Sequence, residues 1–252
     1  MKGFVYQVVK EASRLLIKNF GRYKEKRGLA KEVVTKIDKA INELLVEKLK
    51  NKYPFNFLSE ELGFINNKSE FTWVIDPLDG TANFAVGNPF FSISIALLHE
   101  QKPIFGLIYA PILKELYLAE EGKGSYLNGR PIEVSKISSL RKSYILYCEG
   151  GSKTNARIAK INFLVHPKVK DIRKLGSAAL ECAWVASGRA EGYYTLKISP
   201  WDVAAGVLLV EEAGGKVTDF KGKTWKPKKC NFIATNERIH KRLLSLINKN
   251  TT

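Results

Sequence analysis

The stretch Trp73-Val74-Ile75-Asp76-Pro77-Leu78-Asp79-Gly80-Thr81-Ala82-Asn83-Phe84 joins a run of strand-forming residues to a polar turn. The apolar residues 73–75 suit a buried strand. Asp76, Asp79 and Gly80 are poor at continuing a strand, so we expect the strand to end there. The sequence therefore predicts two carboxylates at the point where a buried strand turns into a loop.

These two carboxylates, three residues apart on a turn, can face one centre. Their mutual repulsion makes that arrangement unfavourable unless a cation lies between them. Hard oxygen ligands suit Mg²⁺ or Mn²⁺. Gly80-Thr81 then offers backbone N–H groups to an anion at a possible helix start. The alternative, open at this point, is an acidic turn in which an Asp only caps a helix.

Length and composition indicate an ordinary globular chain. Its 252 residues suffice for one large domain or two small ones, and its 45% hydrophobic content is typical. No apolar run approaches the roughly 20 residues of a membrane span, and the first residues lack a signal-peptide core. Cys148, Cys182 and Cys230 form no paired motif, so we expect reduced thiols and a cytoplasmic, soluble protein.

The formal net charge is +16, which raises the question of an anionic partner. Lys and Arg are spread along the chain without a dense basic run interleaved with aromatic residues, so a nucleic-acid binder is not favoured. A basic surface that attracts small anionic substrates is the preferred interpretation. The two Gln and one Met, with abundant Lys, Ile and Tyr, hint at a thermophilic origin.

Apolar spacing predicts two helices, 2–19 and 35–52, followed by a mostly antiparallel sheet within 72–134. Asn128-Gly129 is a strong hairpin turn. Strands and helices alternate in the second half, which ends in a basic helix predicted at 236–248. We expect residues 1–252 to form a single compact unit with two lobes, residues 1–140 of α+β type and residues 141–252 of α/β type.

Six acidic residues lie at predicted strand ends or helix starts, or on a helix that could approach them: Asp38, Glu60, Glu61, Asp76, Asp79 and Asp202. Asp202 follows Pro200-Trp201, so taken alone it suits a simple helix cap. Glu60-Glu61 taken alone suits a solvated pair. The case for a metal site depends on their combination.

Four ordered motifs resemble those of the inositol monophosphatase and fructose-1,6-bisphosphatase superfamily. They are Val34-Thr35-Lys36-Ile37-Asp38, Ser59-Glu60-Glu61, Asp76-Pro77-Leu78-Asp79-Gly80-Thr81, and Trp201-Asp202-Val203-Ala204-Ala205-Gly206 with Glu212-Ala213-Gly214-Gly215. The match spans nearly the whole chain. It implies a layered αβαβα sandwich, of mixed α+β and α/β character, and a metal-dependent phosphomonoesterase.

The resemblance also implies site roles. It implies that Asp38 and Thr81, with Glu60, act on the attacking water, and that the amides of Gly80 and Thr81 bind phosphate oxygens. A third, weaker ion near Glu60 is usual in the family, and Mn²⁺ is a possible substitute for Mg²⁺. Two Mg²⁺ ions would be held by Glu60, Asp76 and the Leu78 carbonyl, and by Asp76, Asp79 and Asp202.

Substrate choice is expected to depend on the second half. Gly176-Ser177-Ala178 resembles the family segment that contacts the sugar or polyol. Thr195 occupies the position, seven residues before Asp202, where animal inositol monophosphatases have a Glu that binds inositol hydroxyls. With Lys197 and Arg173 nearby, this change favours a second phosphate on the substrate.

These features predict a Mg²⁺-dependent phosphatase of the archaeal-type dual-activity group, acting on inositol 1-phosphate and on fructose 1,6-bisphosphate. One alternative is a 3′(2′),5′-bisphosphate nucleotidase that hydrolyses 3′-phosphoadenosine 5′-phosphate. Another is a non-catalytic protein that kept the fold. The resemblance further implies a homodimer. We expect no nucleic-acid or membrane partner.

Overall fold

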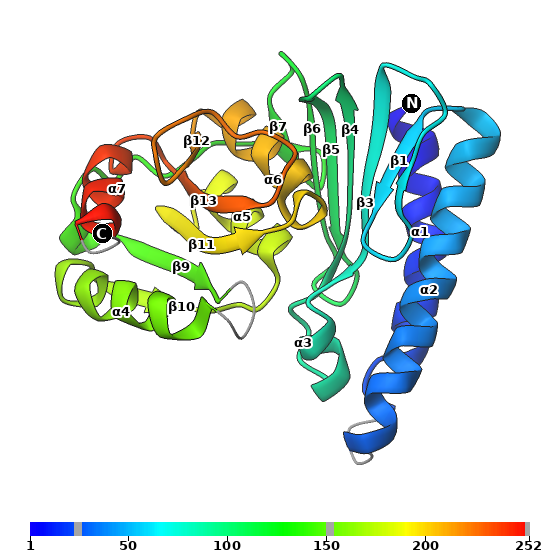
Figure 1. The fold of residues 1–252 in the computed structure, drawn as a ribbon, viewed down its shortest axis with the longest axis horizontal. Helices are drawn as coiled ribbons and strands as arrows, with labels where there is room; N and C mark the ends of the chain where they lie inside the picture. Colours follow the sequence, from blue (N-terminus) through cyan, green and yellow to red (C-terminus); the bar gives the residue numbers. More distant parts are fainter. Residues whose placement is uncertain (23–26, 150–153, 250–252) are drawn as a thin grey trace.

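The computed structural model describes residues 1–22, 27–149 and 154–249, and it shows five stacked layers (Figure 1). Helices cover one face of an eight-stranded sheet, further helices lie between it and a five-stranded sheet, and a last pair covers the outer face. The predicted αβαβα sandwich is therefore confirmed. No helix in these ranges has both the length and the apolar character needed to cross a membrane.

The first layer consists of α1 (Lys2–Asn19) and α2 (Arg27–Lys52). Helical spacing buries one face of α1, namely Val5, Val8, Ala12 and Leu16. Helix α2 begins at Arg27, so the predicted start at 35 is eight residues too late. The physical reason is that 29–32 are good helix formers, although the segment lacks an apolar stripe. Residues 23–26 lie outside the described part.

The first sheet has the order β2-β1-β3-β4-β5-β6-β7-β8. Its strands pair antiparallel, except that β1 runs parallel to β3. Asn128-Gly129 joins the last two strands with positive φ at both residues, as predicted. The strands are β1 (Asn56–Ser59), β2 (Gly63–Ile65), β3 (Phe71–Asp79), β4 (Ser92–His99), β5 (Lys102–Ala110), β6 (Glu115–Glu120), β7 (Ser125–Leu127) and β8 (Arg130–Ile132).

Strand β3 runs past the end that the sequence predicts. Its pairing with β4 shifts register between Asp76 and Asp79, and the strand continues through Asp79. A bulge absorbs Pro77, which has no N–H to give to the ladder. The two carboxylates therefore belong to an irregular strand end and not to a free loop.

The second sheet has the order β10-β9-β11-β13-β12. Its strands are β9 (Tyr144–Cys148), β10 (Asp171–Arg173), β11 (Gly192–Ile198), β12 (Lys216–Asp219) and β13 (Cys230–Thr235). Helices α5 (Ala178–Ala186) and α6 (Pro200–Glu212) lie between the sheets, and α4 (Asn155–Val165) and α7 (His240–Asn248) lie outside. Helix α7 starts four residues after the predicted 236. Asn236 Oδ1 instead accepts from the Ile239 amide at 3.3 Å, in a turn that precedes the helix.

Helices α5 and α6 are apolar on nearly all sides because a sheet covers each side of the pair. They approach each other closely at Gly206, where an added Cβ would lie 2.4 Å from Cys182 Cβ. On the sheet side, an added Cβ at Gly106 would lie 2.8 Å from the Ala205 carbonyl oxygen. Glycine at 206 lets α6 approach α5, and glycine at 106 lets β5 approach the backbone of α6.

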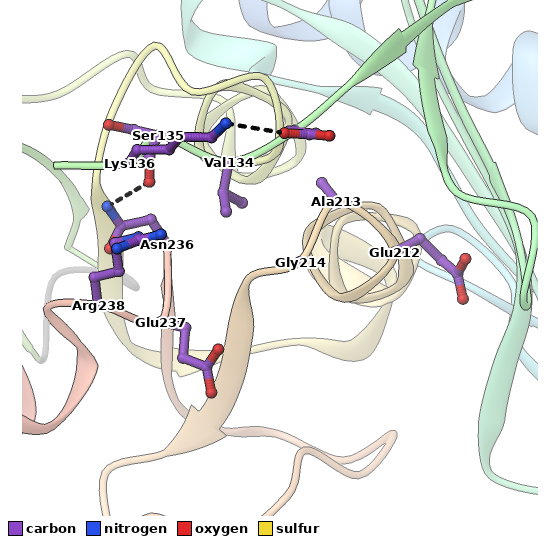
Figure 2. Close-up of a pocket in the computed structure, with 10 residues that line it drawn as sticks. Val134, Ser135, Lys136, Glu212, Ala213, Gly214, Asn236, Glu237 and Arg238 are labelled. Atoms are coloured by element: carbon purple, nitrogen blue, oxygen red, sulfur yellow. Dashed lines mark hydrogen bonds and ion pairs between the residues drawn. The ribbon is translucent and has the colours of Figure 1, made fainter. Parts of the chain in front are cut away.

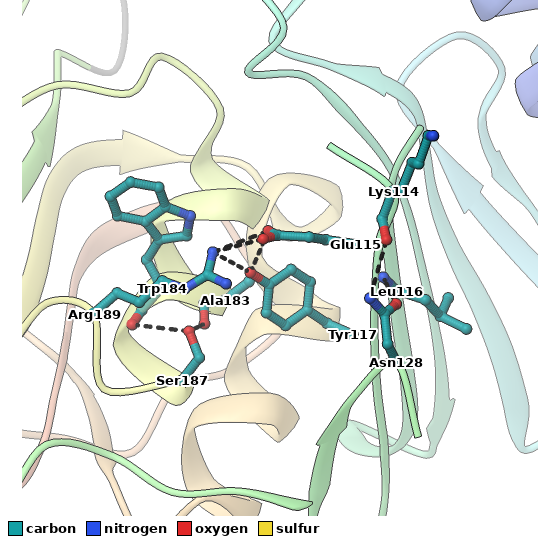
Figure 3. A network of polar contacts seen from close by, with 9 residues as sticks. All are labelled: Lys114, Glu115, Leu116, Tyr117, Asn128, Ala183, Trp184, Ser187 and Arg189. Carbon is teal, nitrogen blue, oxygen red and sulfur yellow. Dashed lines mark hydrogen bonds and ion pairs between the residues drawn. The ribbon is translucent and has the colours of Figure 1, made fainter. Parts of the chain in front are cut away.

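Polar contacts join the first sheet to the second half of the chain. Arg189, after α5, donates to Glu115 Oε2 at 3.0 Å and to the Tyr117 hydroxyl at 3.2 Å, both on β6 (Figure 3). The segment between β8 and β9, which connects the two sheets, is bonded to the residue after β13. Asn236 Nδ2 donates to Ser135 O at 2.9 Å beside a polar cavity (Figure 2). These contacts set how the elements of the two sheets face each other.

Candidate functional site

Glu60 and Asp76 are brought together by the parallel pairing of β1 and β3. Ser59 pairs with Ile75, so the next residue on each strand stands at the same edge. The Glu60 amide also donates to the Ile75 carbonyl at 3.3 Å. Two residues sixteen positions apart in sequence thus become neighbours through strand register.

Asp202 reaches the same place from the second half of the chain, at the start of α6. Its Oδ2 accepts a hydrogen bond from the Ser199 amide at 2.9 Å, so the predicted helix cap is present. The cap does not exclude the metal role, because carboxylate oxygens of Asp202, Glu60 and Asp76 lie within 4.8 Å of one another. The structure therefore brings three predicted ligands to one point.

Asp38 lies on α2 beside this group. The Ser59 hydroxyl donates to Asn42 Oδ1. Asn42 lies one helical turn after Asp38, so this bond holds that part of α2 against the end of β1. Asp38 is buried, and its Oδ1 has no hydrogen-bond partner among the described residues. Burial, with the charges of Glu61 and Glu60, raises the pKa of Asp38 to about 8.

Asp79 points to a different partner. Its Oδ2 accepts from the Ser177 hydroxyl and from the Ala179 amide at 2.8 Å, and its Oδ1 accepts from the Ala178 amide at 3.1 Å. Burial raises the pKa of Asp79 to about 6, and these donors oppose the rise. Asp79 is thus adjacent to the acidic group while its carboxylate caps the start of α5.

The turn after Asp76 is held by its own polar atoms. Asp76 Oδ1 accepts from the Leu78 amide at 3.0 Å, and the Thr81 hydroxyl donates to the Leu78 carbonyl at 3.0 Å. Gly80 has φ of 90°, and an added Cβ would lie 2.8 Å from the Phe90 carbonyl oxygen. A short helix, α3 (Thr81–Val86), follows directly.

The acidic group is electrostatically unfavourable by itself. Burial and the neighbouring carboxylates raise the pKa of Glu60 and Asp76, and raise that of Asp202 to about 8. A divalent cation removes this repulsion. Glu60, Asp76 and Asp202 provide only hard oxygen donors, so the residues present fit a metal ion of the Mg²⁺ or Mn²⁺ type.

The metal-free protein is expected to lose stability as the pH rises. Unfolded Asp has a pKa of about 3.9, whereas Asp38 and Asp202 in the fold have pKa values of about 8. The folded state then binds more protons between pH 4 and 8, so stability is highest below this window and falls through it. Thermal denaturation in EDTA across that window measures the effect.

Saturating Mg²⁺ is expected to weaken this pH dependence, and Asp38→Asn is expected to reduce its slope. A melting temperature in EDTA that rises steadily from about pH 5 to pH 8 would contradict the raised pKa values.

The residues expected to contact substrate differ in how exposed they are and in what they contact. Lys197 is exposed, with its amide bonded to Asn231 Oδ1 at 3.1 Å. Arg173 forms an ion pair with Asp171 at 2.9 Å. Thr195 is fully buried and its hydroxyl has no partner among the described residues, so its contact with substrate stays a prediction.

Three further residues at the site were not singled out by the sequence. Asn83 and Glu181 bond to the segment before α5. Lys229 is near enough to lower the pKa of Asp202. Asn83 lies within the stretch 73–84 that carries the two carboxylates, and Glu181 is the one charged residue of the otherwise apolar segment 178–186. Both features of the sequence could have marked these residues as candidates.

Comparisons with known proteins agree with this geometry. The model of the inositol monophosphatase family matches residues 1–252. A fructose-1,6-bisphosphatase/inositol-1-monophosphatase of Thermotoga maritima is 37% identical over 98% of this chain and 95% of its own. Inositol monophosphatase 3 of Solanum lycopersicum is 37% identical over 96% of this chain and 94% of its own.

Among solved structures, the extragenic suppressor protein suhB of Bartonella henselae superimposes with a TM-score of 0.88. It is 35% identical, and the match covers 98% of each chain. Sequence, fold and the converging carboxylates thus agree. The chain therefore belongs to the inositol monophosphatase family, whose members are metal-dependent phosphatases.

Proposed function

We propose that the protein hydrolyses inositol 1-phosphate, and fructose 1,6-bisphosphate as a second substrate, in a Mg²⁺-dependent reaction. The observation that carries the proposal is the convergence of Glu60, Asp76 and Asp202 from three distant segments on one point. The Thermotoga maritima relative, whose name states both activities, supports the pair of substrates.

Mg²⁺ is proposed because the ligand atoms are all oxygens, and Mn²⁺ is expected to substitute. Bound metal lowers the pKa of water and stabilises charge on phosphate oxygens, which the slow uncatalysed hydrolysis of phosphate monoesters requires. Glu60, Asp76 and Asp202 would hold the ions, with the Leu78 carbonyl and Asp79 as further ligands by resemblance.

Other residues of the chain are proposed to handle the water and the phosphate. Asp38 is buried beside Glu60, and burial raises its pKa to about 8, so its carboxylate form, the proton acceptor, prevails only above that pH. The Thr81 hydroxyl, bonded to the Leu78 carbonyl, would orient the attacking water. The amides of Gly80 and Thr81 would bind phosphate oxygens, as the family resemblance implies.

Phosphate release from inositol 1-phosphate, fructose 1,6-bisphosphate and 3′-phosphoadenosine 5′-phosphate, each with Mg²⁺ and with EDTA, tests the proposal. We expect release from the first two, and only with metal. Turnover of the nucleotide alone would assign the protein as a nucleotidase. Equal rates in EDTA would refute the mechanism. Absence of both turnover and metal-induced thermal stabilisation would favour a non-catalytic protein.

Two lysines are candidates to bind a second phosphate. Ile198 pairs with Cys230, which places Lys229 beside Ser199 at the start of α6. The positive charge of Lys229 is near enough to Asp202 to lower the pKa of that carboxyl, which burial raises. Lys197 is exposed on the neighbouring strand end, one residue before Ile198.

Lys229→Ala and Lys197→Ala are each expected to lower kcat/KM for fructose 1,6-bisphosphate about tenfold while changing that for inositol 1-phosphate little. Only fructose 1,6-bisphosphate has a second phosphate that these lysines could contact, so only its turnover should suffer. Lys221→Ala, on an exposed turn that follows β12, is the control for charge alone. Equal losses on both substrates would argue against recognition of a second phosphate.

A further inference from the structure

The segment Leu175-Gly176-Ser177, which precedes α5, is bonded by side chains from two separate parts of the chain. Asn83 Nδ2, on α3, donates to the Leu175 carbonyl at 2.7 Å. Glu181, in the first turn of α5, accepts from the Leu175 amide at 2.9 Å and from the Gly176 amide at 3.2 Å. The polar backbone groups of this bend are therefore held from both sides.

Glu181 is an unusual residue for its place. It is fully buried, and every bond it receives in the described structure goes to one oxygen, Oε1. Its Oε2 is buried without a partner among the described residues, although the Tyr193 hydroxyl is near enough to lower the pKa of Glu181. A buried carboxyl group is unfavourable, so packing alone does not account for it.

Gly176 and Asn83 fit each other closely. Gly176 has φ of 83°, and an added Cβ would lie 3.0 Å from Asn83 Nδ2. Asn83 is itself fixed, because Nδ2 also donates to the Phe90 carbonyl at 2.6 Å and Oδ1 accepts from Asn88 Nδ2 at 3.1 Å. The first half of the chain thus presents a rigid amide to this bend.

The last residue of the bend, Ser177, and the two residues after it bind Asp79. The Ser177 hydroxyl and the amides of Ala178 and Ala179 all donate to its carboxylate. Any movement of the bend moves these three donors together, because they start α5 directly after it. The orientation of Asp79 therefore depends on a segment that Asn83 and Glu181 hold.

We propose that Asn83 and Glu181 are positioning residues that clamp Leu175-Gly176-Ser177 so that the start of α5 fixes the carboxylate of Asp79 in the active site. The functional part of this inference rests on the proposed metal-dependent hydrolysis. The structural part, the clamp itself, does not. Removing a direct hydrogen-bond partner of a metal ligand changes metal affinity or activity about 10- to 100-fold. Asn83 and Glu181 act one step further from Asp79, so the lower end of that range is expected for them.

The first test compares Glu181→Ala, Glu181→Gln and Asn83→Ala in the full-length protein. Glu181→Ala and Asn83→Ala are expected to raise the Mg²⁺ concentration for half-maximal activity about tenfold. Glu181→Gln keeps an acceptor oxygen for both amides and is expected to stay within about threefold of the wild type. The double alanine variant should be less than additive, since both residues hold one segment.

Glu191 provides a matched control. It is equally buried, and its Oε2 accepts from the Tyr144 amide at 2.7 Å, at the start of β11 away from Asp79. Glu191→Ala is expected to lower the melting temperature without changing the Mg²⁺ requirement. The same shift in Mg²⁺ requirement from Glu191→Ala and Glu181→Ala would mean that general destabilisation, and not the clamp, is responsible.

Amide hydrogen exchange tests the clamp independently of activity. Asn83→Ala is expected to speed exchange at the Ala178 and Ala179 amides, which Asn83 does not touch. Unchanged exchange there would overturn the proposal, and this readout also serves if Glu181→Ala does not fold. If the wild type shows no metal-dependent hydrolysis, the proposed function fails, while faster exchange would still support the clamp.

Discussion

Asp76→Asn is expected to abolish phosphate release while making the metal-free protein more stable. Asp76 is fully buried, and repulsion from Asp79, Glu60 and Asp202 adds to the effect of burial on its pKa. The change removes a charge but keeps the Oδ1 atom that accepts from the Leu78 amide. A lost ligand should reduce kcat/KM more than about 100-fold, beyond the effect of residues outside the ligand set.

The stability half of this prediction is measured by thermal denaturation in EDTA at about pH 8. For a domain of this size, each 1 kcal/mol of repulsion removed raises the melting temperature by about 2–4 °C. Mg²⁺ should then stabilise the variant much less than the wild type.

Asp219→Asn is the matched control for this prediction. Asp219 also accepts backbone amides, from Lys221 and Lys223 at 2.8 Å, but it is the half-buried last residue of β12 and does not belong to the acidic group. We expect Asp219→Asn to leave both activity and the effect of Mg²⁺ unchanged. A metal-free Asp76→Asn protein less stable than the wild type would show that the carboxylates do not repel one another as inferred.

Gly206→Ala is expected to give a large loss of stability. The new Cβ would lie 2.4 Å from Cys182 Cβ and 2.8 Å from its Sγ, so α5 and α6 must separate. Both helices lie between two sheets, which leaves no free direction for the movement (Figure 1). Overpacking of this kind costs about 1–3 kcal/mol or more. Because each helix start holds part of the site, activity should fall as well.

Gly3→Ala makes the same chemical change in α1, where an added Cβ meets nothing within 4 Å. There the substitution should stabilise the protein by about 0.5–1 kcal/mol, because Ala loses less backbone entropy in a helix than Gly. Urea denaturation of the two variants measures both signs. A Gly206→Ala protein as stable as Gly3→Ala would show that the α5–α6 contact relaxes easily.

The motifs in the sequence were sufficient for the acidic set, and the family resemblance that they carry implied the layered architecture. Apolar periodicity identified α1 and most strands, because a buried face leaves apolar residues at a spacing of two in a strand and of three to four in a helix. Ordered motifs identified Asp38, Glu60, Asp76 and Asp202 as candidates. Boundaries that depend on non-local partners were less well predicted, such as the early start of α2 and the continuation of β3 to Asp79.

The partners of each side chain could not be read from the sequence, because strand register and helix docking set them over long separations. Parallel pairing of β1 with β3 places Glu60 beside Asp76. Packing of α5 against the end of β3 gives Asp79 its donors about a hundred residues away. Local residue types therefore determined what chemistry the chain offers, whereas tertiary contacts decided which carboxylates converge and which one α5 holds.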